Sequence, residues 1–210
     1  MRRVLWVAMV GLLWSPFAEG QLSEEQSVEW QIKEGRIMPA PINKNVLFVI
    51  ASQDFRDEEF TAPYEALKTA GAKLSVASSR KGAARGMLGK VVDAGLVVKD
   101  ARAADYDAVI FIGGSGAQEF FDDPAAHRLA KDTVQQGKLL AAICIAPATL
   151  ANAGVLQGKK ATCFPAVEKY LLKGGATLVR QNVVQDGKLI TAPGPQAAPA
   201  FAAAVLAALH

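Results

Sequence analysis

The sequence has few of the side chains that most often move protons in enzymes. It contains only two histidines and two cysteines among 210 residues. His127 falls in the first turn of an expected helix, where we expect it to be solvated, and His210 ends the chain. Neither histidine is placed to act as a general base, so other side chains must carry any acid-base chemistry.

An excess of charge of either sign is also missing. The 23 Lys and Arg residues against 20 Asp and Glu residues leave a formal net charge of +3. The sequence has no basic stripe with interleaved aromatic residues, which argues against a nucleic-acid partner. It has no internal repeats. Hydrophobic residues make up 51% of the chain, enough for the core of one globular domain.

The apolar run at residues 4–14 is too short to cross about 30 Å of hydrocarbon as a helix. Two arginines precede this run, Pro16 ends it, and a small-x-small sequence follows at residues 18–20. This order is typical of a signal peptide over residues 1–20, cleaved near Gly20. We therefore expect a periplasmic or secreted protein with no stable membrane anchor after cleavage.

The remaining chain divides into an arm and a domain. Residues 21–44 mix charges without a sustained apolar period, which predicts an N-terminal arm. From residue 45, short β-branched runs alternate with longer amphipathic stretches, a pattern typical of a parallel α/β sheet. The domain over 45–210 is expected to have strands at 45–52, 73–78, 107–114, 138–144 and 189–193. Four of these are apolar on both faces, as strands covered by helices on both sides are.

Helices are expected between these strands, at 57–71, 122–137 and 195–210. Acidic residues and proline open the first two, and glycine closes them. In the last helix, Phe201, Val205 and Leu209 recur every four residues and so predict a buried face. Two stretches, 89–100 and 183–190, resemble hairpins and are expected to add antiparallel strands to the sheet. The second contains an Asp-Gly turn.

The segment KLLAAICIAPATLANAG, residues 138–154, runs from an expected strand through Cys144 directly into an expected helix. A strand-turn-helix order of this kind is the layout of a nucleophile elbow. The helix N-terminus would favour the thiolate through its free N–H groups. A buried cysteine at the end of a core strand is also common and inert. A third alternative is a disulfide with Cys163, because an exported chain meets an oxidising compartment.

Four segments, in order along the chain, resemble the ThiJ/PfpI family, which includes the parkinsonism-associated deglycase and has a class I glutamine amidotransferase-like fold. They are DFRDEEFTAP, IFIGGSG, AAICIAPATLANAGVLQGKKATCFP and APGPQAAPAF. The resemblance runs from about residue 43 to the C-terminus. It implies a flavodoxin-like three-layer α/β sandwich with a mostly parallel central sheet. It also implies a homodimer, a small reactive carbonyl substrate and no cofactor.

The resemblance assigns roles to particular residues. It implies that Cys144 is the reactive cysteine and that Glu59, four residues before Pro63, is its partner acid. A carboxyl beside a thiolate in a dry pocket is pushed toward its protonated form and can then donate to the sulfur. The backbone N–H groups of Gly114 and Ile145 correspond to the family's oxyanion donors.

The departures from the family pattern concern histidine. Relatives described as peptidases have histidine directly after the cysteine, where this chain has Ile145. The deglycase branch has histidine at the position that corresponds to Phe164, which we expect to line the pocket together with Gly113. Because side chains alternate along a strand, Cys163 should point away from Phe164, which favours free cysteines over a disulfide.

Two other features are expected to bind nothing. Asp54, Asp57 and Glu58 stand together like metal ligands, but the acidic first turn of a helix explains them, so we expect no metal site. The GGSG sequence lacks the lysine and the spacing of a phosphate-binding loop.

Three functions remain open from the sequence. The first, which we favour, is a glyoxalase or deglycase in which Cys144 attacks a reactive carbonyl and Glu59 moves protons. The second is a non-enzymatic oxidative-stress sensor or chaperone-like protein whose Cys144 is oxidised. The third, a peptidase, falls behind because its histidine is missing.

Overall fold

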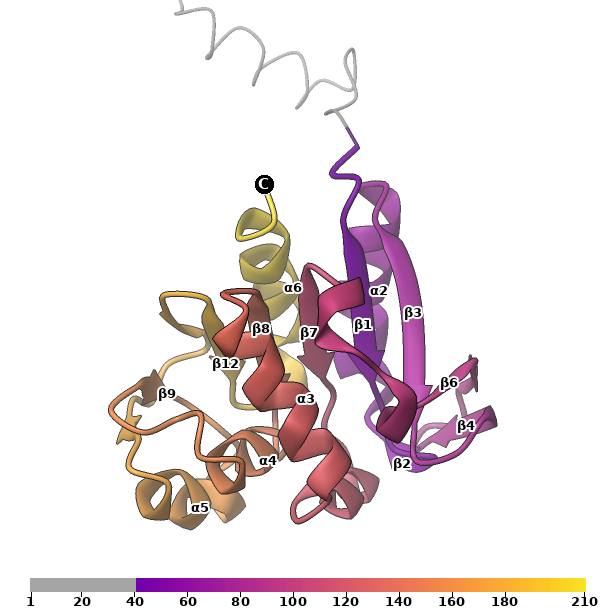
Figure 1. Ribbon diagram of the computed structural model, residues 1–210. Helices are drawn as coiled ribbons and strands as arrows, with labels where there is room; N and C mark the ends of the chain where they lie inside the picture. The colour runs from indigo at the N-terminus through magenta and orange to yellow at the C-terminus, as the bar shows by residue number, and fades with distance from the viewer. Residues whose placement is uncertain (1–40) are drawn as a thin grey trace, which may run out of the picture. The chain divides into compact units, whose positions relative to one another are not determined.

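The computed structural model describes residues 41–210 and is built around one large sheet (Figure 1). The strands of this sheet are β1 (Asn45–Val49), β3 (Lys73–Ser78), β6 (Leu96–Val97), β7 (Ala108–Phe111), β8 (Leu139–Ile143), β11 (Val184–Asp186) and β12 (Leu189–Ala192). Their order across the sheet is β11-β12-β8-β7-β1-β3-β6. Every neighbouring pair is parallel except β11 and β12. The expectation of a mostly parallel central sheet is confirmed.

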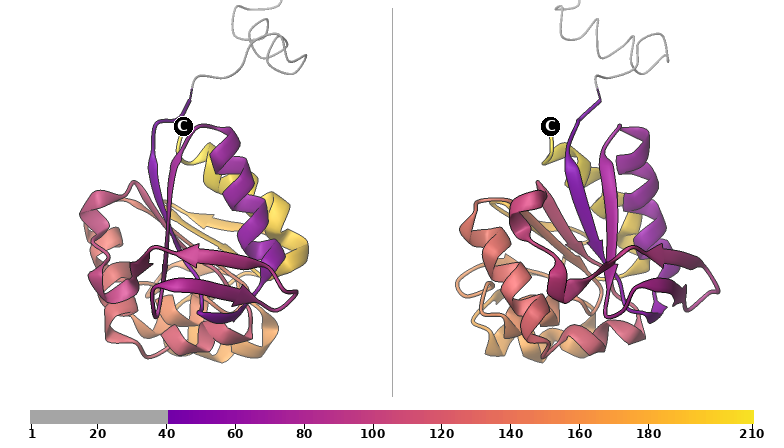
Figure 2. Two further views of the ribbon diagram at one scale, coloured as in Figure 1. Left: turned by 90° about the vertical axis from the view of Figure 1, so that its right-hand side faces the viewer. Right: turned by 45° about the vertical axis from the view of Figure 1, so that its right-hand side comes forward.

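Helices cover both faces of this sheet. Helices α2 (Asp57–Thr69) and α6 (Ala198–Ala207) pack against each other on one face, and α3 (Pro124–Gln135) lies on the other (Figures 1 and 2). Helices α4 (Pro147–Asn152) and α5 (Glu168–Lys173) pack together near the carboxyl ends of the strands. Short 3-10 helices occupy Val98–Asp100, Ala103–Asp105, Ser115–Phe120, Pro165–Val167 and Pro195–Ala197. The fold is thus the expected flavodoxin-like three-layer sandwich.

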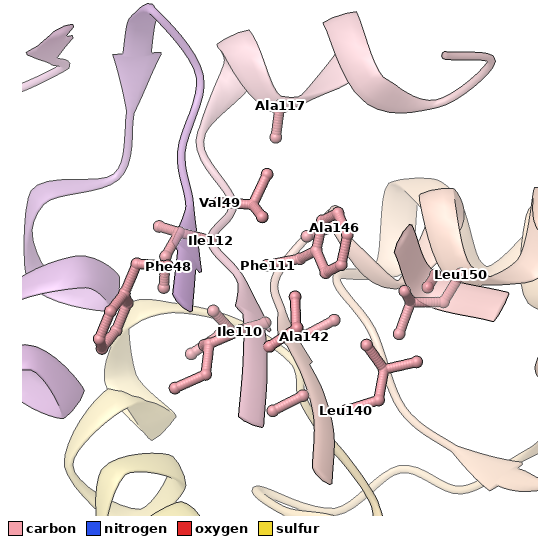
Figure 3. Packing of buried hydrophobic residues seen from close by; sticks show 14 of the residues in the cluster. Phe48, Val49, Ile110, Phe111, Ile112, Ala117, Leu140, Ala142, Ala146 and Leu150 are labelled. Carbon is pink, nitrogen blue, oxygen red and sulfur yellow. The ribbon is translucent and has the colours of Figure 1, made fainter. Parts of the chain in front are cut away.

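The core lies on both faces of the sheet, as the apolar strands predict. Every residue of β7, β8 and β12 is buried. Figure 3 shows part of this core, with Ile110 and Phe111 of β7 next to Ala142 of β8. The predicted face of the last helix is buried, since Phe201 and Val205 of α6 are 0% exposed and Leu209, just after its end, is 6% exposed.

Smaller sheets complete the fold. Strands β2 (Gln53–Phe55), β4 (Gly82–Gly86) and β5 (Val91–Ala94) form a three-stranded sheet in the order β2-β4-β5. Strands β9 (Lys160–Ala161) and β10 (Thr177–Leu178) form a parallel pair. Figure 2 shows the β4–β5 hairpin set apart from the central sheet.

One of the two expected hairpins is present and the other prediction is wrong. The turn at Asp186 and Gly187 joins β11 to β12 as an antiparallel pair in the central sheet. The stretch 89–100 forms no hairpin of its own. Its β5 pairs with β4 in the small sheet, and its β6 extends the central sheet in parallel next to β3. Only Gly95 separates β5 from β6, and one residue is too short for a hairpin turn.

Of the expected arm, only residues 41–44 belong to the described part of the chain. There Ile42 packs near the end of α2, and its N–H donates to the Ala70 carbonyl at 2.9 Å. The predicted signal peptide at 1–20, and the arm up to residue 40, lie outside the described residues. Within 41–210, no helix has the length and apolar character needed to span a membrane.

Candidate active site

Four of the expected site residues follow the carboxyl ends of two neighbouring strands: Gly113 and Gly114 follow β7, and Cys144 and Ile145 follow β8. Strands β7 and β8 are parallel, with Phe111 paired to Ala142. Continuing this register by two residues brings Gly113 level with Cys144. Open α/β sheets bind their ligands at this edge, because the loops that follow parallel strands meet there.

Cys144 stands at a sharp turn between β8 and α4. Its φ of +66° lies in the left-handed region, which non-glycine residues rarely adopt. Its N–H donates to the Ala192 carbonyl at 2.9 Å, and its carbonyl accepts from the Phe164 N–H at 2.8 Å. Helix α4 then begins at Pro147. The strand-turn-helix layout expected at this cysteine is therefore present.

Cys144 lines a pocket of about 600 Å³. Glu59, Gly114, Ile145 and Phe164 line the same pocket, so the fold brings these sequence-predicted residues together. The rest of the wall consists of Arg56, Met87, Ser115, Gln118, Phe121, Ala166, Val167, Lys169, Tyr170, Pro195 and Gln196. Neither histidine of the chain lines this pocket.

Gly113 lies between Glu59 and Cys144. A Cβ atom at this position would lie 2.5 Å from Cys144 Cβ and 2.6 Å from Glu59 Oε2. Real Cβ atoms do not make contacts that close, so only glycine fits here. The absence of a side chain at Gly113 is therefore what lets Glu59 and Cys144 face each other.

Glu59 lies in the first turn of α2 and is completely buried. Burial raises its pKa to about 7, against the opposing effects of the Cys144 thiol, the Gly113 backbone and the Arg56 charge. Neither carboxyl oxygen has a well-aligned hydrogen-bond partner among the described residues. A buried carboxyl without a fixed partner is readily protonated near neutral pH.

Burial opposes the effect that the sequence predicts for the N–H groups at Cys144, and it favours the thiol. Burial first, and then the charge of Glu59, raise the pKa of Cys144 to about 12. The N–H groups of Gly114 and Ile145 do lower this pKa, as expected, but burial outweighs them. Because a charge on either partner disfavours a charge on the other, Cys144 and Glu59 together hold at most one negative charge.

Gly114 brings the next loop onto the site. Its φ of +99° lies in the glycine-favoured region, and a Cβ atom there would overlap the backbone of Asp54 and Arg56. The Arg56 N–H donates to the Gly113 carbonyl at 2.9 Å. Arg56 is in turn paired with Glu58, with 2.8 Å between Nε and Oε2.

Phe164 lines the pocket at 43% exposure, as expected from the resemblance. His127 does not behave as predicted. It is half-buried rather than solvated, and its Nε2 lies 2.8 Å from the Phe121 carbonyl. This bond holds His127 at a different pocket, away from Cys144.

Both cysteines are free. Cys163 is 3% exposed and does not line the pocket, in agreement with the expectation that it points away from Phe164. Burial, followed by the charge of Glu168, raises the pKa of Cys163 to about 12.

The acidic residues near Glu59 have separate structural roles. Asp54 lies in β2 with a φ of +57°, whereas Glu58 pairs with Arg56. Asp57 accepts hydrogen bonds from the backbone of the β4–β5 turn. Within residues 41–210, no three His, Cys, Asp or Glu side chains are grouped so that they could hold a metal ion.

Sequence reasoning missed the walls of the pocket. Arg56, Met87 and Tyr170 lie in three distant segments, and no local pattern connects them. The preference for acidic residues in the first turn of a helix already explains Asp57 in the sequence. The hydrogen bonds that Asp57 accepts from the β4–β5 turn could therefore not be predicted.

Comparison with known proteins identifies the family of this chain. A sequence model of the DJ-1/PfpI family matches residues 44–208. An uncharacterised protein of Methanocaldococcus jannaschii is 40% identical over 171 residues, covering 80% of this chain and 83% of that protein. A deglycase of Pyrococcus abyssi is 30% identical over 149 residues, covering 71% of this chain and 90% of the deglycase.

A solved structure has the same fold. A ThiJ/PfpI domain protein of Brachyspira murdochii superimposes with a TM-score of 0.77 at 34% identity, covering 81% of this chain and 98% of that one. The family match spans most of the described residues, including both β7 and the turn at Cys144. The chain belongs to the DJ-1/PfpI family.

Proposed function

We propose that the protein is a cysteine-dependent enzyme of the glyoxalase or deglycase type that acts on small reactive carbonyls. The observation that carries this proposal is the placement of Cys144, at a left-handed turn in a pocket, against the buried carboxyl of Glu59. The deglycase among its relatives supports the same class of substrate.

The first step is addition of the Cys144 sulfur to the carbonyl carbon. A carbon–sulfur bond forms, the carbonyl π bond breaks, and the electron pair moves to oxygen. The thiol proton passes to Glu59 and from there to this oxygen, which gives a hemithioacetal. The N–H groups of Gly114 and Ile145 stabilise the oxyanion while it forms.

With a 2-oxoaldehyde, the second step is a proton transfer within the substrate. Glu59 removes the proton from C1 and returns a proton to C2, and the proton of the C1 hydroxyl passes to the C2 oxygen. C1 is thus oxidised and C2 reduced without an external oxidant. Water then cleaves the resulting thioester, which releases a 2-hydroxy acid and restores the thiol. Glu59 suits both roles because its pKa of about 7 lies near the working pH.

Consumption of methylglyoxal tests the proposal. The wild-type protein should produce lactate, whereas the Cys144→Ala variant should not. Glu59→Gln keeps the size of the side chain but cannot exchange a proton, and should also lose turnover. Equal rates for the wild type and Cys144→Ala would remove the enzymatic proposal.

Oxidative sensing is the second candidate, favoured by the lack of histidine around the pocket and by the N–H groups that face the sulfur. Each peroxide molecule would transfer one oxygen atom to the sulfur and leave as water, giving first a sulfenic and then a sulfinic acid. A protonated Glu59 would donate to a sulfinate oxygen. Mild peroxide should then add two oxygen atoms, about 32 Da, to the peptide that contains Cys144. An unchanged mass would exclude this function.

Assembly and export belong to the proposal as well. We propose a homodimer, as is usual in the family, that is exported through cleavage near Gly20. Light scattering of the purified protein tests the dimer. The N-terminal mass of the protein recovered from the producing cells tests the cleavage.

A further inference from the structure

The turn between β4 and β5 forms part of the rim of the Cys144 pocket. Met87 in this turn lines the pocket and is 43% exposed. Leu88, the next residue, is 64% exposed but does not line the pocket. The two neighbours are both exposed apolar residues of similar size, and only Met87 lines the pocket.

A buried carboxylate holds this turn in place. Asp57 is 7% exposed. Its Oδ2 accepts from the Leu88 N–H at 2.9 Å, and its Oδ1 accepts from the Lys90 N–H at 2.8 Å. Two hydrogen bonds from one buried side chain therefore fix the backbone of the turn at Leu88 and at Lys90.

Backbone contacts add to this anchor. The Met87 N–H donates to the Phe55 carbonyl at 2.9 Å, and the Gly86 N–H donates to the Lys90 carbonyl at 2.7 Å. A Cβ atom on Gly86 would lie 2.6 Å from the Cγ of Asp57, so this position has no room for a side chain. The turn therefore packs directly on the carboxylate.

Asp57 also lies close in the chain to Glu59, the acid of the proposed reaction. Asp57 is the first residue of α2, and Glu59 follows two residues later. The position of Met87 relative to Glu59 and Cys144 is consequently set by one short, hydrogen-bonded segment. A methionine there gives the rim a flexible but bulky apolar side chain.

We propose that Met87, held at the rim by Asp57, determines the size of the molecules that reach the Cys144 sulfur. This inference rests on the proposed function only for the natural substrate, because access to the sulfur can be measured without turnover. Met87 is then a specificity-determining residue and Asp57 a positioning residue.

Alkylation with two reagents of one chemistry but different size tests the proposal. Iodoacetamide is small, and 5-iodoacetamidofluorescein carries a bulky ring system. In both reactions the sulfur displaces iodide, a carbon–sulfur bond forms, and the thiol proton passes to the buffer. The rate is followed by mass analysis of the peptide that contains Cys144, which separates it from Cys163. The ratio of the two rates cancels any change in the reactivity of the sulfur itself.

In Met87→Ala, we expect the ratio of the rate with the bulky reagent to the rate with the small reagent to rise about tenfold, the lower end of the range that one methylene in a pocket produces. In Leu88→Ala, the matched control, the ratio should stay at the wild-type value. Asp57→Asn keeps the shape but loses one acceptor and the charge, and should raise the ratio by a smaller factor. An unchanged ratio in Met87→Ala, or an equal rise in Leu88→Ala, would overturn the proposal.

Turnover provides the second readout. If wild-type protein consumes methylglyoxal, Met87→Ala should raise kcat/KM for phenylglyoxal relative to methylglyoxal, whereas Leu88→Ala should not. If the wild type consumes neither compound, the proposed function fails, and the alkylation ratio still decides the role of Met87. Turnover with the relative kcat/KM unchanged in Met87→Ala contradicts the role of Met87 alone.

Discussion

Each of the two buried cysteines has a glutamate as its charged neighbour, and the two pairs differ in their surroundings. In both, burial is the main cause that raises the pKa of the cysteine to about 12, and the charge of the glutamate adds to it. Cys144 has Glu59 as its neighbour, and Cys163 has Glu168. A pKa alone therefore does not distinguish the two thiols.

Their surroundings do distinguish them. Glu168 is partly exposed and binds Arg180 through both oxygens, at 2.9 and 3.1 Å. Glu59 is completely buried and has no such cation on its carboxyl. Only Cys144 lines the pocket and is approached by two backbone N–H groups. The comparison teaches that the acid, the pocket and the N–H groups make the difference, whereas burial is common to both cysteines.

Replacement of each cysteine in turn should give the largest difference in activity between the two sites. Cys144→Ala should lower kcat/KM for methylglyoxal by about a thousandfold or more, because the nucleophile is gone. Cys163→Ala should leave kcat/KM within about twofold, because that side chain faces away from the pocket. A large loss in Cys163→Ala, with an unchanged melting temperature, would contradict the assignment.

Gly113→Ala should separate the acid from the cysteine. The new methyl group overlaps both partners, so we expect a loss of about 3 kcal/mol in the free energy of unfolding, together with loss of turnover. Gly95→Ala is the matched control, since a Cβ atom there meets nothing within 4 Å. It should change the free energy of unfolding by no more than about 0.5 kcal/mol in urea titrations. Equal losses in the two variants would refute the close approach at Gly113.

The pH dependence of stability should report on Glu59. Its pKa is about 7 in the folded protein and 4.5 in the unfolded chain, so between these values the folded state binds the extra proton. The free energy of unfolding should therefore fall as pH rises from 4.5 through 7, by on the order of 3 kcal/mol, and level off above. Glu59→Gln should remove this fall.

Glu168→Gln is the control for that experiment. It keeps Glu59, so the fall in stability attributed to Glu59 should remain. Loss of the exposed ion pair with Arg180 should cost less than about 1 kcal/mol. A Glu59→Gln variant with the full pH dependence of the wild type would show that another group causes it.

The smallest expected effect concerns the missing histidine. Phe164→His places an imidazole at the pocket wall, on the residue whose own N–H donates to the Cys144 carbonyl. A general base near the sulfur should raise kcat/KM for methylglyoxal about tenfold. Phe164→Leu controls for the loss of the aromatic ring and should give no rise. Equal changes in both variants would mean that the imidazole contributes no acid-base chemistry.

Much of the fold was predictable from local patterns. The expected strand 73–78 coincides with β3, and the strands buried on both faces follow their apolar runs. The failure at 89–100 has a physical cause. Its two apolar segments look alike in sequence, but they are separated only by Gly95 and form strands of different sheets, β5 next to β4 and β6 next to β3. Strand β4, with the sequence GAARG, has no β-branched residue that would have marked it.

The reactive residues of the candidate site were predictable from the sequence, whereas the residues of the pocket rim were not. Cys144 follows from the strand-turn-helix pattern, and Glu59 and Gly114 from the resemblance to the family. The net pKa of Cys144 was not accessible, because it depends on how deeply the tertiary structure buries the sulfur. Met87 was not predictable, because its turn is held at the pocket by long-range bonds, among them the one from Leu88 to Asp57, thirty-one residues away in the chain.

Competitive alkylation of the two cysteines in one native sample tests the difference between them most directly. The protein is treated with a limiting amount of iodoacetamide, and the peptides that contain Cys144 and Cys163 are quantified together by mass spectrometry. We expect Cys144 to react at least about tenfold faster, because it faces an open pocket and a proton acceptor. Equal rates, or faster reaction of Cys163, would contradict the assignment of Cys144 as the reactive residue.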